Sequence, residues 1–531
     1  MKNYSLRNWL LIVPIFVALA ARVPFDFQPF HCVDEGVLGT MGNIILRGGL
    51  PYRDGWCHRG PLLHYIYAGI FALFGRNNML AVHLLTTCII GIQSWLLYRL
   101  ARLYFDKTVG LVAALLFVFF STFGYSPEDS LAANVEIWMN IFILLSINVF
   151  VRTLRSDSRW GYLGSGVLLG LAALTKQVAF ALLPLLVITL LLAHNWEMCG
   201  RRKMPVEIIK FSFMIVVGTL LPLAGTIAWY VHNRALEDFT HLFFGYNLHY
   251  ISSFYAPSTG VSLRTLIKRF LESGLSNLSI FASGRTLLPH GLFVAGLLND
   301  VVSRIWRING LPLPTRFFYF WFLASAIPLL ALGRAFPHYY LQLLPIVSVV
   351  AAAMAERIYS KCSSPISRFA LMMFCACLLV YPAITFIFEY KSEPYSVARR
   401  QRLDAVTAYV KAHSSPSDSI FVWGWDMELY CLTDRQNASR FIFFSFLTDR
   451  TYGDAEPAKY AGDLSHLPTV KICIDDLTKA QPRLILDGYV AEEFTWQFPL
   501  KRYQTLWEYI NNNYHAVKKI NGYVVYERNS P

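Results

Sequence analysis

The sequence predicts a polytopic α-helical membrane protein that ends in a small α/β domain. Of its 531 residues, 55% are hydrophobic and only 15% are charged, and the mean hydropathy is +0.41. Soluble domains carry about a quarter charged residues, so this composition excludes an ordinary soluble enzyme as well as a disordered chain. Apolar stretches of a length suited to crossing a bilayer recur through residues 1–390, and only the last part of the chain lacks them.

About eleven apolar stretches qualify as transmembrane helices. They are residues 9–25, 80–98, 109–124, 134–151, 161–175, 178–194, 208–231, 283–301, 317–333, 338–356 and 369–388. The fifth and sixth stretches are short and meet at Lys176, which must reach water or a polar cavity because a lysine is costly in lipid. We therefore expect eleven spans, give or take one.

The distribution of charge orients these spans. Residues 391–531 hold 17 Lys and Arg against 17 Asp and Glu, so the whole net charge of +13 lies in residues 1–390. With the N-terminus inside, the inner loops hold 18 Lys and Arg against 6 acids, and the outer loops hold 12 against 11. The positive-inside rule predicts a cytoplasmic N-terminus, long outer loops at 26–79 and 232–282, and an extracytoplasmic tail. The excess of bases thus reflects topology and indicates no nucleic-acid partner.

The composition changes after Phe388, and we expect a soluble domain over residues 391–531. Residues 399–413 repeat apolar side chains at helical spacing, and the apolar run 420–423 that follows them is typical of a strand. Asn521-Gly522 is a strong hairpin turn between two short strands. Further elements are expected at 483–486 (strand) and 503–511 (helix). Without a nucleophile motif, phosphate loop or metal cluster, this domain favours a structural or acceptor-docking role over a catalytic one.

The nine cysteines form no CxxC pair, so no metal or redox framework is predicted. Cys32 and Cys57 share the first outer loop, where an oxidising compartment would allow a disulfide. Separate free thiols are the interpretation that we favour.

The first outer loop carries the most polar candidates for chemistry. Asp34 and Glu35 are adjacent, and the residues after them repeat apolar side chains as a helix lying along the membrane surface would. A carboxylate at that boundary suits a general base acting on a hydroxyl, with ordinary loop carboxylates as the alternative. Arg59, preceded by His58, offers paired donors that match phosphate oxygens, with a snorkelling anchor as the alternative.

Further candidates lie at the outer ends of later spans. Glu136 is a carboxylate at membrane depth, and Lys176 is its candidate partner, with a purely structural ion pair as the alternative. His249 lies in the aromatic-rich segment 241–255 and is a candidate ligand for a phosphate or a divalent ion. Three further candidates, Arg334, His338 and Tyr339, lie at the outer border of spans nine and ten. We expect them to line one cavity together with the candidates named above.

These segments resemble bacterial GT-C glycosyltransferases of the protein O-mannosyltransferase and aminoarabinose-transferase kind, glycosyltransferase family 39. The resemblance covers nearly the whole chain. In the membrane part it rests on Asp34-Glu35-Gly36, Ile45–Tyr52, His58-Arg59-Gly60-Pro61, Asn134–Trp138, Gly170–Gln177 and His338–Pro345. In the tail it rests on Ile420–Asp426 and Gly522–Arg528.

The resemblance implies a GT-C fold and transfer of a hexose or pentose from a polyprenyl monophosphate to an acceptor, with inversion, outside the bacterial inner membrane. By position, it implies Asp34 as general base, with Glu35 beside it and Glu136 as a second acid. The donor phosphate would be bound by Arg59, Lys176, His58 and His249. Arg59-Gly60 stand where the family commonly has Lys-Pro, which keeps the charge and alters loop stiffness.

Several alternatives stay open at this point. Metal dependence varies within the group, so the resemblance fixes no cofactor, and a divalent cation is an open alternative. The acceptor is a glycan, a lipid or a protein. A flippase of a lipid-linked saccharide would use the same phosphate ligands without a base, and a ligase or polymerase would use a diphosphate-linked glycan instead.

Overall fold

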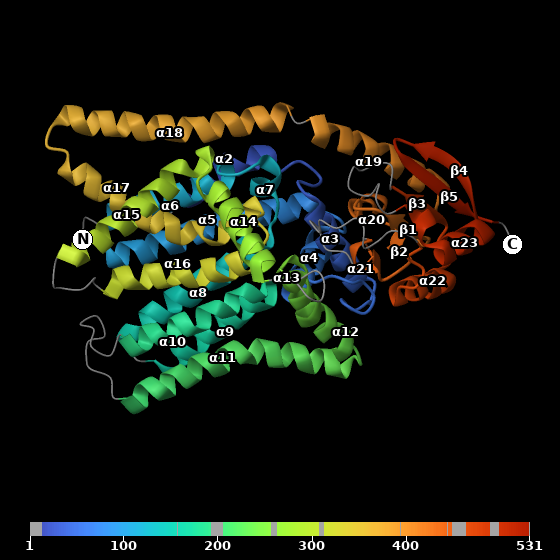
Figure 1. Cartoon of the computed structure of the whole chain (residues 1–531), viewed down its shortest axis with the longest axis horizontal. Coiled ribbons are helices and arrows are strands. Elements are labelled where there is room, and N and C mark those ends of the chain that lie inside the picture. Colours follow the sequence, from blue (N-terminus) through green and yellow to red (C-terminus); the bar gives the residue numbers. More distant parts are fainter. Residues whose placement is uncertain are drawn as a thin grey trace. The chain divides into compact units, whose positions relative to one another are not determined.

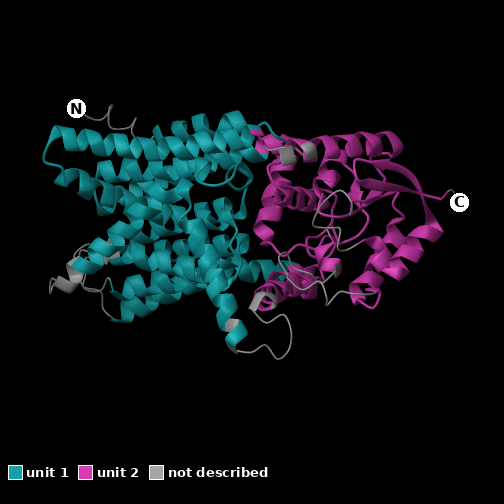
Figure 2. Ribbon diagram, turned by 45° about the horizontal axis from the view of Figure 1, so that its top comes forward, with its two compact units in different colours: residues 1–28, 82–229, 260–391 teal, residues 29–81, 230–259, 392–531 magenta. Residues whose placement is uncertain are grey.

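The computed structural model (Figure 1) describes residues 13–156, 158–192, 205–255, 263–306, 313–392, 394–442, 444–448, 463–488 and 499–529. This part of the chain is mainly helical and contains a five-stranded sheet near its C-terminal end. The chain forms two compact units (Figure 2). Unit 1 comprises residues 1–28, 82–229 and 260–391, and unit 2 comprises residues 29–81, 230–259 and 392–531. Each unit is therefore built from three separate stretches of sequence.

Helices, most of them apolar, make up unit 1. They are α2 (Val13–Arg22), α5 (Met79–Tyr104), α6 (Lys107–Phe123), α7 (Pro127–Leu131), α8 (Val135–Ser156), α9 (Arg159–Thr175), α10 (Leu182–Leu192), α11 (Pro205–His232), α14 (Leu263–Phe281), α15 (Leu287–Trp306), α16 (Leu313–Ala331), α17 (Leu344–Lys361) and α18 (Pro365–Ser392). Every apolar stretch expected to span the membrane overlaps one of these helices. Among the described residues, α5, α8, α11 and α18 are long and apolar enough to cross a membrane by themselves. The structure thus confirms a helical membrane protein, and the count of eleven spans stays a prediction.

Close helix packing fixes the end of α9, where Lys176 lies. A Cβ on Gly166 would lie 2.2 Å from the Ile215 carbonyl oxygen, and a Cβ on Gly218 would lie 2.2 Å from that of Leu163. Small residues let membrane helices approach backbone to backbone in this way. The α9–α11 contact therefore holds α9 rigidly and sets the position of its C-terminal end.

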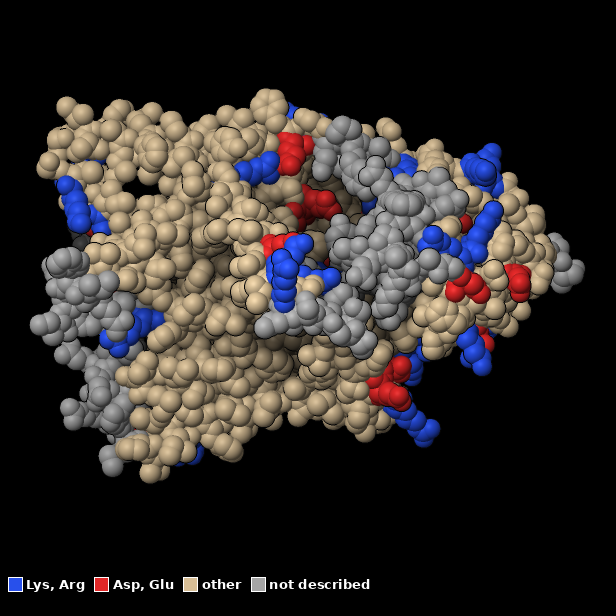
Figure 3. Space-filling view, in the orientation of Figure 1, with Lys and Arg blue, Asp and Glu red and all other residues tan. Residues whose placement is uncertain are grey.

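Helix α14 buries two polar side chains and exposes several apolar ones, together with Lys268, Glu272, Ser276 and Ser279. Ser273 and Asn277 are buried, and the Tyr340 hydroxyl donates to the Asn277 carbonyl oxygen at 2.8 Å. The apolar side chains that are exposed are those of Ile267, Phe270, Leu271, Leu275 and Leu278. Water would disfavour this arrangement, whereas lipid favours it. Most of the visible surface of unit 1 is likewise free of charged side chains (Figure 3). We therefore propose that the apolar side chains of residues 273–281 contact lipid, while the outer loop expected over residues 232–282 stays a prediction.

Spin labels on α14 test this placement. A label on Leu275→Cys should be reached by oxygen, which concentrates in hydrocarbon, and protected from a water-soluble nickel complex. Lys268→Cys is the matched control, because Lys268 is equally exposed on the same helix but lies among its charged first turns. Both variants need a background without the exposed thiols of Cys88 and Cys377. If the nickel complex reached both positions equally well, both would lie in water and the placement would be wrong.

Unit 2 combines two stretches of helices with an α/β tail. Its helices are α3 (Val33–Leu46), α4 (Pro61–Phe74), α12 (Leu236–Thr240), α13 (Tyr246–Tyr255), α19 (Pro394–His413), α20 (Glu428–Thr433), α21 (Ser445–Thr448), α22 (Pro468–Ala480) and α23 (Gln504–Asn513). Its strands are β1 (Ser419–Trp423), β2 (Gln436–Asn437), β3 (Leu484–Asp487), β4 (Tyr514–Ile520) and β5 (Tyr523–Arg528). The sheet order is β2-β1-β3-β5-β4, with β1 parallel to β2 and β3, and β5 antiparallel to β3 and β4.

The elements expected in the tail are confirmed. The helix expected at 399–413 is the main part of α19, and the strands expected at 420–423 and 483–486 pair in parallel with Ile420 opposite Leu484. Asn521 and Gly522 both have positive φ, at 45° and 92°, as a two-residue hairpin turn requires. Strands β1 and β3 are covered on both faces, so nearly all their side chains are buried. The apolar side chains among them form the core of the sheet.

The helix expected after Asp34 and Glu35 is α3, and it is more enclosed than the sequence suggested. All its residues from Glu35 to Ile44 are buried, with α4 and α20 packed against it, whereas a helix lying on a membrane surface would leave one face free. Cys32 and Cys57 are both free thiols, so the disulfide alternative is not formed.

Candidate functional site

An ion pair between Asp34 and Arg59 is the centre of the candidate site in unit 2. Asp34 lies in the first turn of α3, and Arg59 precedes α4, whose start is set by Gly60 and Pro61. The Arg59 side chain is 12% exposed and that of Asp34 is 39% exposed. Burial alone would lower the pKa of the Arg59 guanidinium, but Asp34 raises it above its ordinary value. Arg59 is therefore a permanent cation.

Arg59 also interacts with the Cys57 thiol and has one buried donor without an acceptor in the described part of the chain. Its Nη1 is buried and has no hydrogen-bond partner among the described residues. A buried donor without an acceptor is costly, and a fork-shaped guanidinium that uses one arm on a carboxylate can offer the other arm to an anion. The geometry of the pair therefore suits an oxyanion ligand such as a phosphate.

Glu35 lies beside Asp34 in sequence but in a different environment. It is almost fully buried, and its carboxylate accepts the backbone N–H of His31 at 2.7 Å. An acid in the first turn of a helix is favoured by the helix dipole. The structure thus places Glu35 where it closes the turn before α3, while Asp34 retains access to solvent.

The sequence-predicted histidines of unit 2 lie around α13. The ring of His58 is stacked on that of Tyr250, with centroids 6.1 Å apart and planes 14° apart. Asn247 donates a hydrogen bond to the His58 carbonyl oxygen at 2.9 Å. His249 is exposed on the same helix. The structure therefore brings α13 against the loop that carries Arg59, with His58 inside this contact and His249 outside it.

In unit 1, Glu136 and Lys176 form the ion pair that the sequence suggested. Glu136 lies in the first turn of α8, and Lys176 directly follows α9; Lys176 Nζ is 2.5 Å from Glu136 Oε1. The same Nζ lies 3.9 Å from the centre of the Tyr339 ring. The Glu136 side chain is 2% exposed and that of Lys176 is 18% exposed. The lysine is thus compensated by a carboxylate and by the face of an aromatic ring.

His338 has a partner that the sequence analysis missed. Its Nδ1 lies 2.7 Å from Oδ1 of Asp129, which belongs to the short helix α7. Asn134 donates to the Asp129 backbone carbonyl oxygen. Arg334, four residues before His338 in the sequence, is buried. The Ser126 cap of α7 was a visible signal for a helix start, but nothing in the sequence shows that α7 meets His338.

Arg22 was also missed, because an arginine at the end of an apolar stretch is ordinarily a snorkelling anchor. Here it is fully buried, and its guanidinium donates to the carbonyl oxygens of Ser130 at 2.7 Å and Leu131 at 2.8 Å. It also donates to Thr87 Oγ1 at 3.3 Å. Arg22 therefore fixes the segment that carries Asp129.

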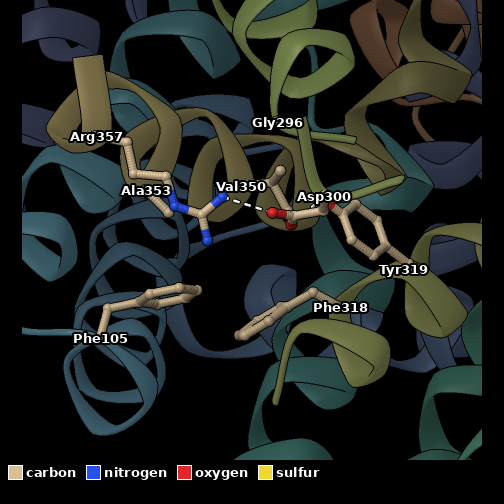
Figure 4. Close-up of a pocket in the computed structure, with 8 residues that line it drawn as sticks. All are labelled: Phe105, Gly296, Asp300, Phe318, Tyr319, Val350, Ala353 and Arg357. Carbon is tan, nitrogen blue, oxygen red and sulfur yellow. Dashed lines mark hydrogen bonds and ion pairs between the residues drawn. The ribbon is translucent and has the colours of Figure 1, made fainter. Parts of the chain in front are cut away.

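A small pocket in unit 1 lies away from all these residues. It is formed by α15, α16 and α17 together with Phe105, and it contains the Asp300–Arg357 ion pair (Figure 4). The two side chains are 2.6 Å apart. Tyr319 donates to Asp300 at 2.8 Å. Its polar groups are thus satisfied by one another. None of the residues predicted from the sequence lines this pocket.

No group of three or more His, Cys, Asp or Glu in the described part of the chain could hold a metal ion. The Asp34–Arg59 and Glu136–Lys176 pairs join residues that were predicted from the sequence, whereas the Asp129–His338 pair joins a predicted residue to one that was not.

Residues 58–221 match the family model described as dolichyl-phosphate-mannose-protein mannosyltransferase. The chain is also similar to two curated proteins named undecaprenyl phosphate-alpha-4-amino-4-deoxy-L-arabinose arabinosyl transferase. The one from Aeromonas hydrophila subsp. hydrophila is 25% identical over 248 residues, and the one from Aeromonas salmonicida is 26% identical over 251 residues. Each match covers 45% of this chain and 43% of the relative, so the chain spans less than half the length of these relatives.

Two solved structures share the fold over nearly the whole chain. ArnT from Cupriavidus metallidurans, bound to undecaprenyl phosphate, has a TM-score of 0.59 at 13% identity, with 98% of each chain covered. The Archaeoglobus fulgidus oligosaccharyltransferase, in complex with Zn and sulfate, has a TM-score of 0.55 at 13% identity, covering 98% of this chain and 73% of that one. The chain is thus similar in sequence, over part of its length, to these mannosyltransferases and arabinosyl transferases, and it shares the fold of ArnT and of the oligosaccharyltransferase over nearly its whole length.

Proposed function

We propose that the protein transfers a hexose or pentose from a polyprenyl-phosphate donor to an acceptor, with inversion, at the outer face of the bacterial inner membrane. The single observation that carries the proposal is the Asp34–Arg59 pair, in which a solvent-accessible carboxylate lies against a buried arginine with an unused donor. The names of the curated relatives and the undecaprenyl phosphate bound to ArnT support this class of donor.

The proposed reaction is a single displacement. Asp34 accepts the proton of the acceptor hydroxyl as the acceptor oxygen forms a bond to the anomeric carbon of the sugar. The bond from that carbon to the phosphate oxygen breaks, and the polyprenyl phosphate leaves with the electron pair. Arg59 donates to the phosphate oxygens and stabilises the charge that grows there. Glu35 holds the turn from which Asp34 extends.

This scheme gives a physical reason for an arginine where the family commonly has a lysine. A lysine presents a compact point charge, whereas the planar guanidinium of Arg59 can contact Asp34 with one arm and a phosphate with the other. Asp34 raises the Arg59 pKa above its ordinary value, so the guanidinium that would bind the phosphate stays positively charged across the physiological pH range. Arg59 can thus hold the Asp34 carboxylate in place and stabilise the leaving phosphate at the same time.

In unit 1, we assign a phosphate-binding role to Lys176 and the role of a second acid to Glu136. The support is that a lysine held by a buried carboxylate and by the Tyr339 ring is oriented before any ligand arrives. His58, His249, Arg334 and His338 complete the set of proposed ligands and cavity residues. The orientation that we propose, with a cytoplasmic N-terminus and an extracytoplasmic tail, is supported by the excess of bases on the inner loops.

Purified protein in detergent or vesicles, supplied with a polyprenyl monophosphate carrying a radiolabelled sugar, tests the proposal. We expect the label to move to an envelope acceptor fraction and an equal amount of polyprenyl phosphate to be released. Movement of intact donor across vesicles without a new glycosidic bond would instead identify a flippase. Activity with diphosphate-linked glycans alone would identify a ligase or polymerase.

A further inference from the structure

We infer that the C-terminal segment positions the acid-bearing helix α3, so that helix α20 is part of the scaffold of the proposed reaction centre and not of a separable docking module. The inference rests on the proposed function and assigns positioning residues for that reaction. It follows from the contacts that α20 makes along the length of α3 within unit 2.

The first contact lies directly beside the acid pair. A Cβ on Gly36 would lie 2.7 Å from the backbone nitrogen of Glu428 and 2.9 Å from its Cγ. No real Cβ sits so close to a backbone atom, so the first turn of α3 can rest on the start of α20 only because this residue is glycine. Gly36 is two residues after Asp34, and a shift of α3 here moves Asp34 as well.

The middle of α3 is held by the next turn of α20. A Cβ on Gly39 would lie 2.8 Å from the Cys431 Sγ. The Thr40 hydroxyl donates to the Gly36 carbonyl oxygen at 2.7 Å and lies 3.3 Å from the Met427 carbonyl oxygen. Cys431 is buried against this face of α3. The two helices therefore pack closely through small residues, with no space for an added methyl group.

The far end of α3 is tied to the end of α20. Arg47 donates to the carbonyl oxygen and to the carboxylate of Asp434, in each case at 3.2 Å. Asp434 follows α20 with a φ of 53°, and Asn77 donates to the same carboxylate at 3.2 Å. Asp434 thus anchors both α3 and the residues after α4 to the tail.

A buried arginine in turn fixes α20. Arg399 of α19 lies 2.7 Å from the Asp426 carboxylate and 3.0 Å from that of Glu428, and both acids are almost fully buried. Burial is the main cause that raises the pKa of Glu428 to about 7, although Arg399 opposes it. The contacts therefore run from α19 through Arg399 to α20, and from α20 to the helix that carries Asp34.

Gly36→Ala in the full-length protein tests this positioning. Because the new Cβ must push α3 away from a backbone atom, we expect kcat to fall about tenfold to a hundredfold. The KM for donor should not rise, because Arg59 is not on α3. The matched control is Gly69→Ala on α4, where a Cβ would meet nothing within 4 Å, and it should keep wild-type kinetics.

A rescue separates a specific contact from general damage. Gly39→Ala should lower kcat in the same way, and adding Cys431→Ala should restore it, because the second change removes the sulfur that the new Cβ would meet. A structural defect elsewhere would not be repaired by this second substitution. Failure of the rescue, or a Gly36→Ala enzyme as active as Gly69→Ala, would overturn the inference.

The alkylation rate of Cys431 reports on the contact between α3 and α20 and does not depend on sugar transfer. The thiol should be protected in the wild type and in Gly69→Ala, and it should react faster in Gly36→Ala because α3 no longer covers it. Equal protection in all three proteins would overturn the inference even if the protein transfers no sugar. An inactive wild type, by contrast, would overturn only the proposed function.

Discussion

Asp34→Asn is expected to lower kcat for sugar transfer by at least about a hundredfold, because the acceptor hydroxyl would lose its general base. The KM for donor should not rise. Asparagine removes the negative charge that shares the Arg59 guanidinium with the donor phosphate, so more of that guanidinium becomes available to phosphate. A loss of kcat without weaker donor binding is therefore the kinetic signature of this substitution, measured by transfer of labelled sugar over a range of donor concentrations.

Asp54→Asn provides the matched control. Asp54 lies in the same stretch of unit 2, pairs with Arg53 at 2.8 Å and is 38% exposed, against 39% for Asp34. It also accepts the Leu50 N–H at 2.7 Å, which an asparagine oxygen can still do. If Asp54→Asn lost as much activity as Asp34→Asn, charge neutralisation in this region would explain both losses, and the assignment of Asp34 as the base would be wrong.

Lys176→Gln is expected to have the largest effect in unit 1, on stability as well as on donor binding. It leaves the Glu136 carboxylate, 2% exposed, without its cation. Breaking a buried ion pair by removing one partner costs about 3–5 kcal/mol, and the remaining solvent access of Lys176 favours the lower end. Thermal unfolding should begin several degrees lower, and the KM for donor should rise if Lys176 binds phosphate.

The double variant Glu136→Gln/Lys176→Gln distinguishes the two roles of Lys176. Two neutral amides can hydrogen-bond to each other, so the double variant should regain most of the lost stability. It should keep a raised donor KM, because the cation is still absent. Arg357→Gln, which breaks the Asp300 pair in the same unit, should lower stability without changing donor KM. Recovery of donor KM in the double variant would reduce Glu136–Lys176 to a structural ion pair.

The sequence predicts most helices of this fold because apolar runs in a membrane protein have one dominant meaning. The same reasoning found the strands at β1 and β3 and the hairpin at Asn521-Gly522, since each depends on residues close together in the chain. It leaves open the environment of α14, where Ile267, Leu271 and Leu275 show a helical stripe but not which environment the stripe faces. Apolar periodicity gives a face, and only the surroundings decide whether protein or lipid covers it.

The candidate site was predicted residue by residue, but its pairings were mostly not. The Asp34–Arg59 pair joins residues of one loop, and their chemical types were enough to single them out. Asp129 and His338 are far apart in sequence, and no local pattern connects them. The contact of α3 with α20 is carried by glycines, and a glycine in a helix gives no sign of what packs against it. Long-range packing is thus the part of the site that residue types cannot supply.

The construction of unit 2 from residues 29–81, 230–259 and 392–531 has a consequence for how the protein is made. Helix α3 is synthesised near the start of the chain, while α20, which covers it, emerges only after nearly four hundred further residues. During that interval α3 exposes the surface that later meets α20, and contacts of such high sequence separation form slowly. A chain that is still being inserted, or one truncated before α20, would hold Asp34 on an unsupported helix. The biogenesis of the protein therefore delays completion of the acid-bearing centre until the tail has been synthesised and has folded.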